Sequence, residues 1–420
     1  MRNDKIKAEP FDCMQYFYRA VQQPLIRCCI SFTGHVDTVV LNRAVNLSAS
    51  VFPLINYGFD EKRHCWIKRG CTAGNIVHVV RLREDGRKVS DILLNSSINI
   101  ASGPQLNLFL LVDDDWDTLC IIINHMVSDG GGFKQYLYLL ASLYSECEKN
   151  SGFSNIMKCS NNRSFSCLLR NLSFDRKLDI LLTKSDAHIP DPAVYMPLEG
   201  NAEKPFIAIR KFDTELFFTI RNHAHENSAS INDMLLTAYM RALHHSTGST
   251  SITVPCPVDL RKYMKGNTSY SICNLTANYR CNIDMVNNES FDETLKKVSS
   301  QMRLQKKNDG CLKMPILYHM AFCILPFRII RKLFYKLSPI PVTSYTNLGV
   351  LDSGKLGFGS LKTEDAFIST AVKNVPYFQV SVSTFENQCT MSSSLYGTEK
   401  DKNTVNELFD FMQKDFESLI

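Results

Sequence analysis

The segment Asn124–Gly132, NHMVSDGGG, links an apolar run to a helical pattern. The run before it, Thr118–Asn124, is rich in branched apolar residues, which is typical of a strand buried on both faces. The segment after it, Phe133–Tyr144, repeats apolar residues at helical spacing. The sequence therefore predicts a buried strand, a tight turn and a helix, with a histidine where the strand ends.

Each residue type in this segment has a chemical use. A histidine titrates near pH ~6.5, so the ring of His125 can take up and return a proton near neutral pH. Asp129 precedes the predicted helix, where it can cap the helix or pair with a distant cation. The three glycines allow a sharp turn and the close approach of another chain segment or a ligand. The alternative is a structural core histidine beside a helix cap.

Strand and helix patterns occur in both halves of the chain. Before the motif, Leu25–Phe32 and Leu106–Val112 predict strands. In the second half, Ser230–His245 predicts a helix capped by its first residue, and Phe378–Thr384 pairs with Cys389–Tyr396 as a predicted hairpin. We therefore expect two mixed α/β lobes: residues 1–160 carrying the motif, a polar linker at 161–205, and 206–420.

Composition excludes several classes of protein. The 420 residues exceed one ordinary domain, and 45% hydrophobic with 21% charged residues indicates a globular chain. A formal charge of +5 does not favour nucleic-acid binding. The fifteen cysteines are scattered without a CxxC pair, and the first residues contain no apolar leader segment. These features predict a cytoplasmic protein with reduced thiols.

With these residues in view, NHMVSDG resembles the HHxxxDG motif of the CoA-dependent acyltransferase superfamily, which includes condensation domains and alcohol acetyltransferases. The helix Ile231–Leu243, the strand Val254–Arg261 (VPCPVDLR) and Ser344–Gly349 (SYTNLG) are similar to elements of its second lobe. The resemblance implies an α/β (α+β sandwich) fold. Two chloramphenicol-acetyltransferase-like lobes would form a V-shaped pseudo-dimer with a central tunnel.

The resemblance also implies roles for single residues. His125 would be the general base, and Asp129, the other catalytic-motif residue, would mainly hold the loop by pairing with Arg261. Gly130 would leave room for the pantetheine arm of the donor. Ser344 and Asn347 would line the substrate tunnel. The expected second lobe would thus supply Arg261 and the far wall of the tunnel.

The implied reaction moves an acyl group from a CoA or carrier-protein thioester to a small-molecule hydroxyl or amine. No cofactor would be tightly bound and no metal is expected, because no histidine or cysteine cluster has zinc spacing. The resemblance favours a monomer without stable membrane insertion. Asn124 stands where the family motif has its first histidine, a supporting position. The alternative is a non-catalytic relative that binds an acyl or peptidyl thioester, or a partner protein, in the same cleft.

The segment Pro315–Leu337 is amphipathic and basic. Arg328, Arg331, Lys332 and Lys336 alternate there with large apolar residues. This pattern predicts a surface helix with its apolar face turned inward, or else a helix that touches a membrane or an acyl-lipid substrate.

Overall fold

The computed structural model describes residues 4–82, 88–154, 163–182, 193–200, 204–264, 271–307, 309–337 and 340–419. The chain divides into two compact units. The first consists of Met1–Leu168, Arg261–Leu275 and Val350–Ala371, and the second of Leu169–Leu260, Thr276–Gly349 and Val372–Ile420. Each half of the chain forms most of one unit, but two segments of the second half belong to the first unit.

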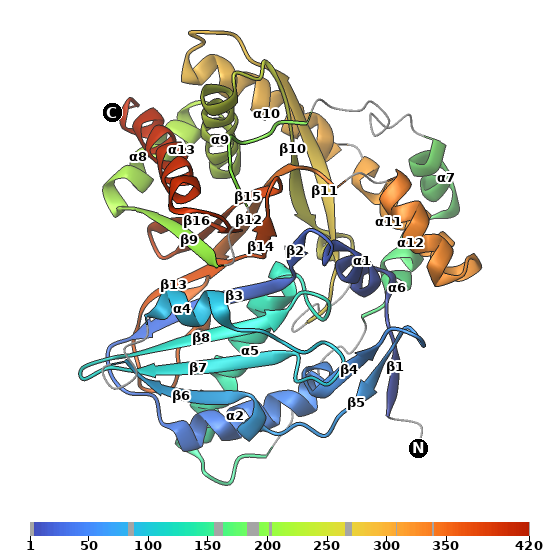
Figure 1. The fold of residues 1–420 in the computed structure, drawn as a ribbon, viewed down its shortest axis with the longest axis vertical. Helices are drawn as coiled ribbons and strands as arrows, with labels where there is room; N and C mark the ends of the chain where they lie inside the picture. Colours follow the sequence, from blue (N-terminus) through green and yellow to red (C-terminus); the bar gives the residue numbers. More distant parts are fainter. Residues whose placement is uncertain are drawn as a thin grey trace. The chain divides into compact units, whose positions relative to one another are not determined.

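Figure 1 shows the helices and strands in chain order by colour. The elements up to residue 170 are β1 (Lys5–Lys7), α1 (Pro10–Tyr18), β2 (Gln22–Gln23), β3 (Leu25–Phe32), α2 (Thr38–Val51), η1 (Pro53–Asn56), β4 (Tyr57–Asp60), β5 (Cys65–Lys68), η2 (Ala73–Asn75), β6 (Val77–Arg81), α4 (Val89–Asn95), β7 (Leu106–Val112), β8 (Asp117–Asn124), α5 (Gly130–Lys149) and α6 (Phe165–Arg170).

The remaining elements follow from residue 174 onwards. They are α7 (Phe174–Leu182), β9 (Pro205–Phe212), α8 (Thr214–Glu226), α9 (Ile231–Thr247), β10 (Ser251–Asp259), η4 (Leu260–Tyr263), β11 (Thr276–Asp284), α10 (Phe291–Lys307), η5 (Asp309–Leu312), α11 (Lys313–Ile324), α12 (Phe327–Leu337), β12 (Thr343–Leu351), η6 (Ser353–Lys355), β13 (Thr363–Ser369), β14 (Val372–Asn374), β15 (Phe378–Phe385), β16 (Gln388–Tyr396) and α13 (Glu399–Glu417).

A five-stranded mixed sheet forms the core of the first unit. Its strand order is β13-β3-β8-β7-β6, with only β6 and β7 parallel. Every residue of the central strand β8 is buried, as its continuous apolar sequence predicts for a strand covered on both faces. On one face, Ile92 and Leu93 of α4 pack with Leu111 and Cys120 of the sheet. The rigid centre of this sheet therefore carries the motif at the end of β8.

The two segments from the second half of the chain complete the first unit. Strand β13 is the edge strand of the five-stranded sheet, where it pairs with β3 from Thr363↔Phe32 to Ser369↔Arg27. The segment Arg261–Leu275 connects β10 to β11, the two strands of an antiparallel pair in the second unit. The sequence predicts lobes of residues 1–160 and 206–420. It does not predict that these two segments of the second half belong to the first unit.

The second unit contains another sheet. Strands β12, β15, β16 and β14 form a sheet in this order, and β9 also pairs along β16. The predicted hairpin of β15 and β16 is present, with Ser381 opposite Ser392. Helices α9 and α13 are joined by an ion pair in which Arg241 Nε lies 2.7 Å from Asp415 Oδ2. Both units are thus mixed α/β structures, as predicted.

The predicted linker at 161–205 contains regular structure. Helices α6 and α7 lie inside it, although residues 161–162, 183–192 and 201–203 of that range fall outside the described residues. The two helices have only six and nine residues. A pattern search over 11 to 18 residues averages such short helices with their polar neighbours, so the sequence does not indicate them.

Candidate functional site

The motif forms the connection between β8 and α5. Asn124 is the last residue of β8 and pairs with Leu25 of β3, and Asp129 is the N-cap of α5. His125 is the first residue after the strand, and its N–H donates to the carbonyl oxygen of Pro24 over 2.9 Å. The histidine backbone is therefore fixed by two neighbouring strand ends.

Asn124 shapes the turn at His125. Its side chain is fully buried, and its Oδ1 accepts a hydrogen bond from Met126 N over 3.0 Å. Its Nδ2 donates to Gln105 Oε1 over 2.6 Å, and Gln105 Nε2 in turn donates to the carbonyl of Tyr57. Asparagine can accept and donate at once, so this residue holds the turn by local hydrogen bonds. These contacts favour the supporting role that the sequence predicts.

His125 itself is half-buried. Its Nδ1 is a buried atom, while part of the residue remains accessible. A partly accessible imidazole on a fixed backbone is suited to exchange a proton with a bound molecule.

The carboxylate of Asp129 is saturated by structural contacts. Its Oδ1 accepts from Gly132 N over 2.7 Å and from Arg261 Nη2 over 3.0 Å. Its Oδ2 accepts from Leu275 N over 2.6 Å and from Arg261 Nη1 over 3.3 Å. The side chains of the ion pair are 3% and 9% exposed. Asp129 therefore acts as a positioning residue that caps α5 and anchors the segment Arg261–Leu275.

The charge of Asp129 is stabilised despite its burial. Burial alone would raise the pKa of this carboxyl group. The Arg261 guanidinium and the N–H groups of Gly132 and Leu275 outweigh that effect, so the pKa of Asp129 is lowered from its ordinary value. The aspartate is charged at neutral pH and holds no proton for a reaction.

Arg261 belongs to the first unit, although the sequence assigns it to the second lobe. Besides Asp129, it donates to the carbonyl oxygens of Ser271 over 3.1 Å and Cys273 over 2.7 Å. These bonds hold the two ends of its own segment together. The expected pair of Asp129 and Arg261 is present, but both partners lie within one compact unit because the segment between β10 and β11 packs there.

Gly132 permits the close approach of this segment to the start of α5. A Cβ atom at this position would lie 2.5 Å from Ser128 Oγ, 2.8 Å from Cys273 O and 2.9 Å from Cys273 N. The approach brings Asp129 N within hydrogen-bond distance of Cys273 O, at 3.2 Å. Gly132, the third glycine of the motif, thus permits the approach of another part of the chain.

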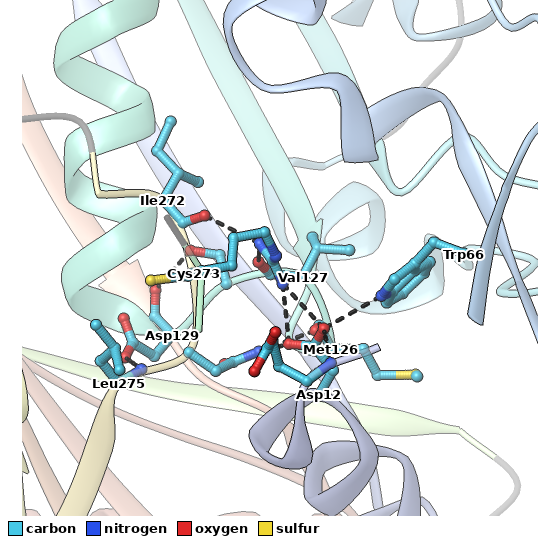
Figure 2. Close-up of polar contacts among 12 residues, drawn as sticks. Asp12, Trp66, Met126, Val127, Asp129, Ile272, Cys273 and Leu275 are labelled. Atoms are coloured by element: carbon cyan, nitrogen blue, oxygen red, sulfur yellow. Dashed lines mark hydrogen bonds and ion pairs between the residues drawn. The ribbon is translucent and has the colours of Figure 1, made fainter. Parts of the chain in front are cut away.

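A second buried carboxylate, that of Asp12, supports the loop between His125 and Asp129. Asp12 of α1 is 1% exposed and accepts hydrogen bonds from Trp66 Nε1 over 3.1 Å and from Asn274 Nδ2 over 3.1 Å. Asn274 Nδ2 also donates to Met126 O over 2.9 Å. Figure 2 shows Asp12 and Trp66 joined beside the backbone of Met126 and Val127. Helix α1 is thereby connected to the residue that follows His125.

Arg163 completes this support. Its Nη2 lies 2.9 Å from Asp12 Oδ1 and 3.0 Å from Asp12 Oδ2. Its Nη1 donates to Val127 O over 2.7 Å and to Ile272 O over 3.0 Å. Arginine is suited to this position because its planar group donates in several fixed directions. Each residue from Met126 to Asp129 therefore makes at least one hydrogen bond that holds the loop in place.

The structure places the other predicted residues in local roles. Gly130 is the half-buried first residue of α5. Ser344 and Asn347 lie on β12 in the second unit. Ser344 Oγ donates to Phe378 O over 3.2 Å, and Asn347 Nδ2 donates to Asn232 Oδ1 over 3.1 Å. Their participation in a substrate tunnel stays a prediction.

Sequence reasoning missed the residues that support the loop from outside the motif. These are Asp12, Trp66, Arg163 and Asn274. The one available signal was Asp12, a carboxylate within an apolar and aromatic helix. Its partners cannot be found by spacing, because Arg163 is 151 residues away and Asn274 is 262 residues away.

Comparisons with known proteins identify the fold. No family model and no curated protein matches the chain. The condensation domain of the monacolin K polyketide synthase MokA matches with a TM-score of 0.69 and 14% identity, over 99% of this chain and 98% of that one. The trichothecene 15-O-acetyltransferase from Fusarium sporotrichioides matches with a TM-score of 0.71 and 12% identity, over 98% and 95%.

The chain has the condensation-domain fold. A further match shows that this fold carries more than one chemistry. The epimerization domain from the third module of tyrocidine synthetase B has a TM-score of 0.68 and 16% identity, over 99% of this chain and 96% of that one. On a shared fold of this kind, the residues of the site determine the reaction.

The part of the chain that the structure describes lacks two other kinds of feature. Among these residues, no helix combines the length and the apolar character needed to span a bilayer. No group of three or more histidine, cysteine, aspartate or glutamate side chains is arranged there to hold a metal ion.

Proposed function

We propose that this protein is an acyltransferase that moves an acyl group from a CoA or carrier-protein thioester to a hydroxyl or amine. The observation that carries the proposal is the partly accessible ring of His125 on a backbone fixed by neighbouring strand ends. The fold is that of condensation domains and of an acetyltransferase, which agrees with this chemistry.

His125 acts as the general base in the proposed reaction. Because Nδ1 is buried, we expect Nε2 to meet the acceptor. This nitrogen takes the proton of the hydroxyl or amine as the acceptor oxygen or nitrogen attacks the thioester carbonyl carbon. The new C–O or C–N bond forms, the C–S bond breaks, and the proton passes from the imidazolium to the leaving thiolate. No covalent enzyme intermediate is required.

The donor is expected to be acyl-CoA or an acyl group on phosphopantetheine, bound as substrate. We propose that Gly130 leaves room for its pantetheine arm and that Ser344 and Asn347 line the acceptor side. Both oxygens of Asp129 already accept hydrogen bonds, including those from Arg261. This supports a proposal in which these two residues fix the loop and His125 alone accepts and returns the proton.

The test compares wild type with His125→Ala. A panel of acyl-CoAs is incubated with alcohols and amines, and acylated products are detected by intact mass. General-base catalysis of this kind contributes roughly 10²- to 10⁴-fold, so His125→Ala should lower the rate of transfer by that factor. His35→Ala is the matched control, because His35 lies in the same unit with a side chain that is 56% exposed.

Two results would contradict the proposal. Transfer by His125→Ala at the wild-type rate would show that His125 is not the base. Binding of acyl thioesters by folded wild-type protein, without turnover on any acceptor and without hydrolysis that depends on His125, would favour a non-catalytic binding protein.

A further inference from the structure

Helix α11 exposes an apolar stripe. Leu317, Met320 and Ile324 are 40%, 45% and 75% exposed. Their spacing of three and four residues places them on one side of the helix. Scattered exposed apolar residues are ordinary, but a continuous row along one helix face indicates a contact surface.

Helix α7 exposes a second stripe. Phe174, Leu178 and Leu182 follow one another at intervals of four residues and are 76%, 43% and 71% exposed. Arg176 Nε of this helix lies 2.6 Å from Asp309 Oδ2 of η5, which leads directly into α11. All three helices α7, α11 and α12 belong to the second unit, where α7 and α11 both contact η5 and α11 contacts α12 (Figure 1).

Helix α12 adds a basic face. Its residues Phe327, Ile330 and Phe334 are buried, so most of its apolar face points inward, as the first of the two sequence interpretations predicts. The opposite side exposes four cations at helical spacing, Arg328, Arg331, Lys332 and Lys336. No aspartate or glutamate occurs anywhere between Asp309 and Asp352 in the sequence. Helices α11 and α12 therefore carry only basic charged residues, whereas α7 carries Asp175 and Asp179 beside Arg176 and Lys177.

We infer that α7, α11 and α12 form a docking surface for an anionic lipid bilayer. Helices that lie in a membrane interface combine exposed Phe, Leu and Ile side chains with lysine and arginine, and anionic headgroups attract the cations. The cores of protein interfaces are depleted in charged residues, especially lysine, which makes a protein partner the less suitable occupant. This inference is independent of the acyl-transfer chemistry.

The experiment measures sedimentation of the full chain with vesicles. Phosphatidylcholine vesicles with phosphatidylserine are compared with phosphatidylcholine alone, at low and high salt. We expect binding to the anionic vesicles, weakened by salt. A basic residue near such a surface contributes roughly fivefold to partitioning, so the double variant R328E/K332E, which removes two such charges and reverses them, should bind at least about 25-fold more weakly. The variant M320D/I324D should lose a similar factor.

Matched controls separate the surface from general effects. The double variant R221E/K296E reverses two exposed charges on α8 and α10 of the same unit, and Val286→Asp changes a side chain that is 60% exposed elsewhere in that unit. Both should bind like wild type, and all variants should retain the wild-type thermal unfolding midpoint.

The inference is overturned by any of three results. The first is the absence of sedimentation with anionic vesicles. The second is binding that M320D/I324D and R328E/K332E leave unchanged. The third is retention of an acidic protein, such as an acyl carrier protein, by this surface when vesicles are not bound, which would identify a protein partner instead.

Discussion

At the scale of single residues, the site depends on an ion pair that does no chemistry itself. Asp129 and Arg261 are almost fully buried, and each also bonds to the backbone of the segment that they hold. A buried pair of this kind is costly to break by removing one charge, because the other charge then lacks compensation. Its contribution is to fix the loop that carries His125.

We predict that Asp129→Asn lowers the free energy of unfolding at pH 7 by roughly 3–5 kcal/mol. The amide keeps the shape of the carboxylate but leaves the Arg261 charge uncompensated. Denaturant unfolding measures the change. The control is Asp309→Asn, whose ion pair with Arg176 is partly exposed and should contribute at most about 1 kcal/mol.

The same pair predicts a pH dependence. The pKa of Asp129 is lowered in the folded protein, so the stabilisation is complete above the ordinary value of 3.8 and is lost as the pH falls through the lowered pKa. The difference in stability between wild type and Asp129→Asn should shrink in this acidic range. A difference that stays constant down to pH 2 would contradict the prediction.

The sequence predicts the motif residues of the site but not the residues that support them. The motif and its resemblance predict His125, Asp129 and the pairing with Arg261, because these residue types carry a recognisable spacing. The support by Asp12 and Arg163 is invisible, since an ordinary aspartate and arginine 151 residues apart carry no signal of contact.

At the scale of secondary-structure elements, the start of α5 and the segment Arg261–Leu275 form one packed assembly. Gly132 N binds Asp129 on one side, and the Gly132 Cα faces the Cys273 backbone on the other. A side chain there cannot be accommodated by rotating Ser128 alone, because the backbone atoms of Cys273 also lie under 3.0 Å away.

We predict that Gly132→Ala destabilises the protein by about 1–3 kcal/mol, since overpacking must displace the Cys273 backbone. The rate of acyl transfer should fall with it, because the displaced segment carries the partners of Asp129. Gly357→Ala is the control: it lies in the same unit with nothing within 4 Å of its added Cβ. Equal unfolding midpoints for the two variants would refute this account of Gly132.

The observed bounds of an element agree with the predicted bounds where its apolar periodicity begins and ends at the same residues as the element. Strands β3 and β7 start and end at the predicted residues. Helix α5 starts three residues before the predicted Phe133, because the Asp129 cap determines its start. The segment Pro315–Leu337 forms two helices, because proline disfavours helical geometry in the residue before it and Pro326 interrupts the pattern.

At the scale of the whole molecule, the two units are interwoven in sequence. The first unit takes β13 and the segment Arg261–Leu275 from the second half of the chain. Periodicity within a segment cannot indicate this exchange, since it does not specify which strand far away in the sequence the segment will pair with. The sequence predicts two mixed lobes, and their exact membership depends on contacts between distant segments.

We predict that a fragment of residues 1–168 does not fold cooperatively. It lacks the strand that pairs with β3 and the segment that binds Asp129. Thermal unfolding by circular dichroism and the dispersion of its NMR spectrum measure this. Co-expression with residues 169–420 is the comparison, and it should restore a cooperative transition. A fragment that unfolds alone at the full-length Tm would contradict the prediction.

The first unit includes Val350–Ala371 from late in the chain, and this affects its folding during synthesis. The amino-terminal unit cannot close until Ala371 has left the ribosome. At roughly 5–20 residues per second, the intervening stretch of about 200 residues takes about 10–40 s to translate. During that interval the edge of β3 lacks its partner strand β13, and the charge of Asp129 lacks its partners until Leu275 has been added. The nascent chain therefore exposes an unpaired strand edge for much of this time, which is a feature that makes partly folded chains prone to aggregation.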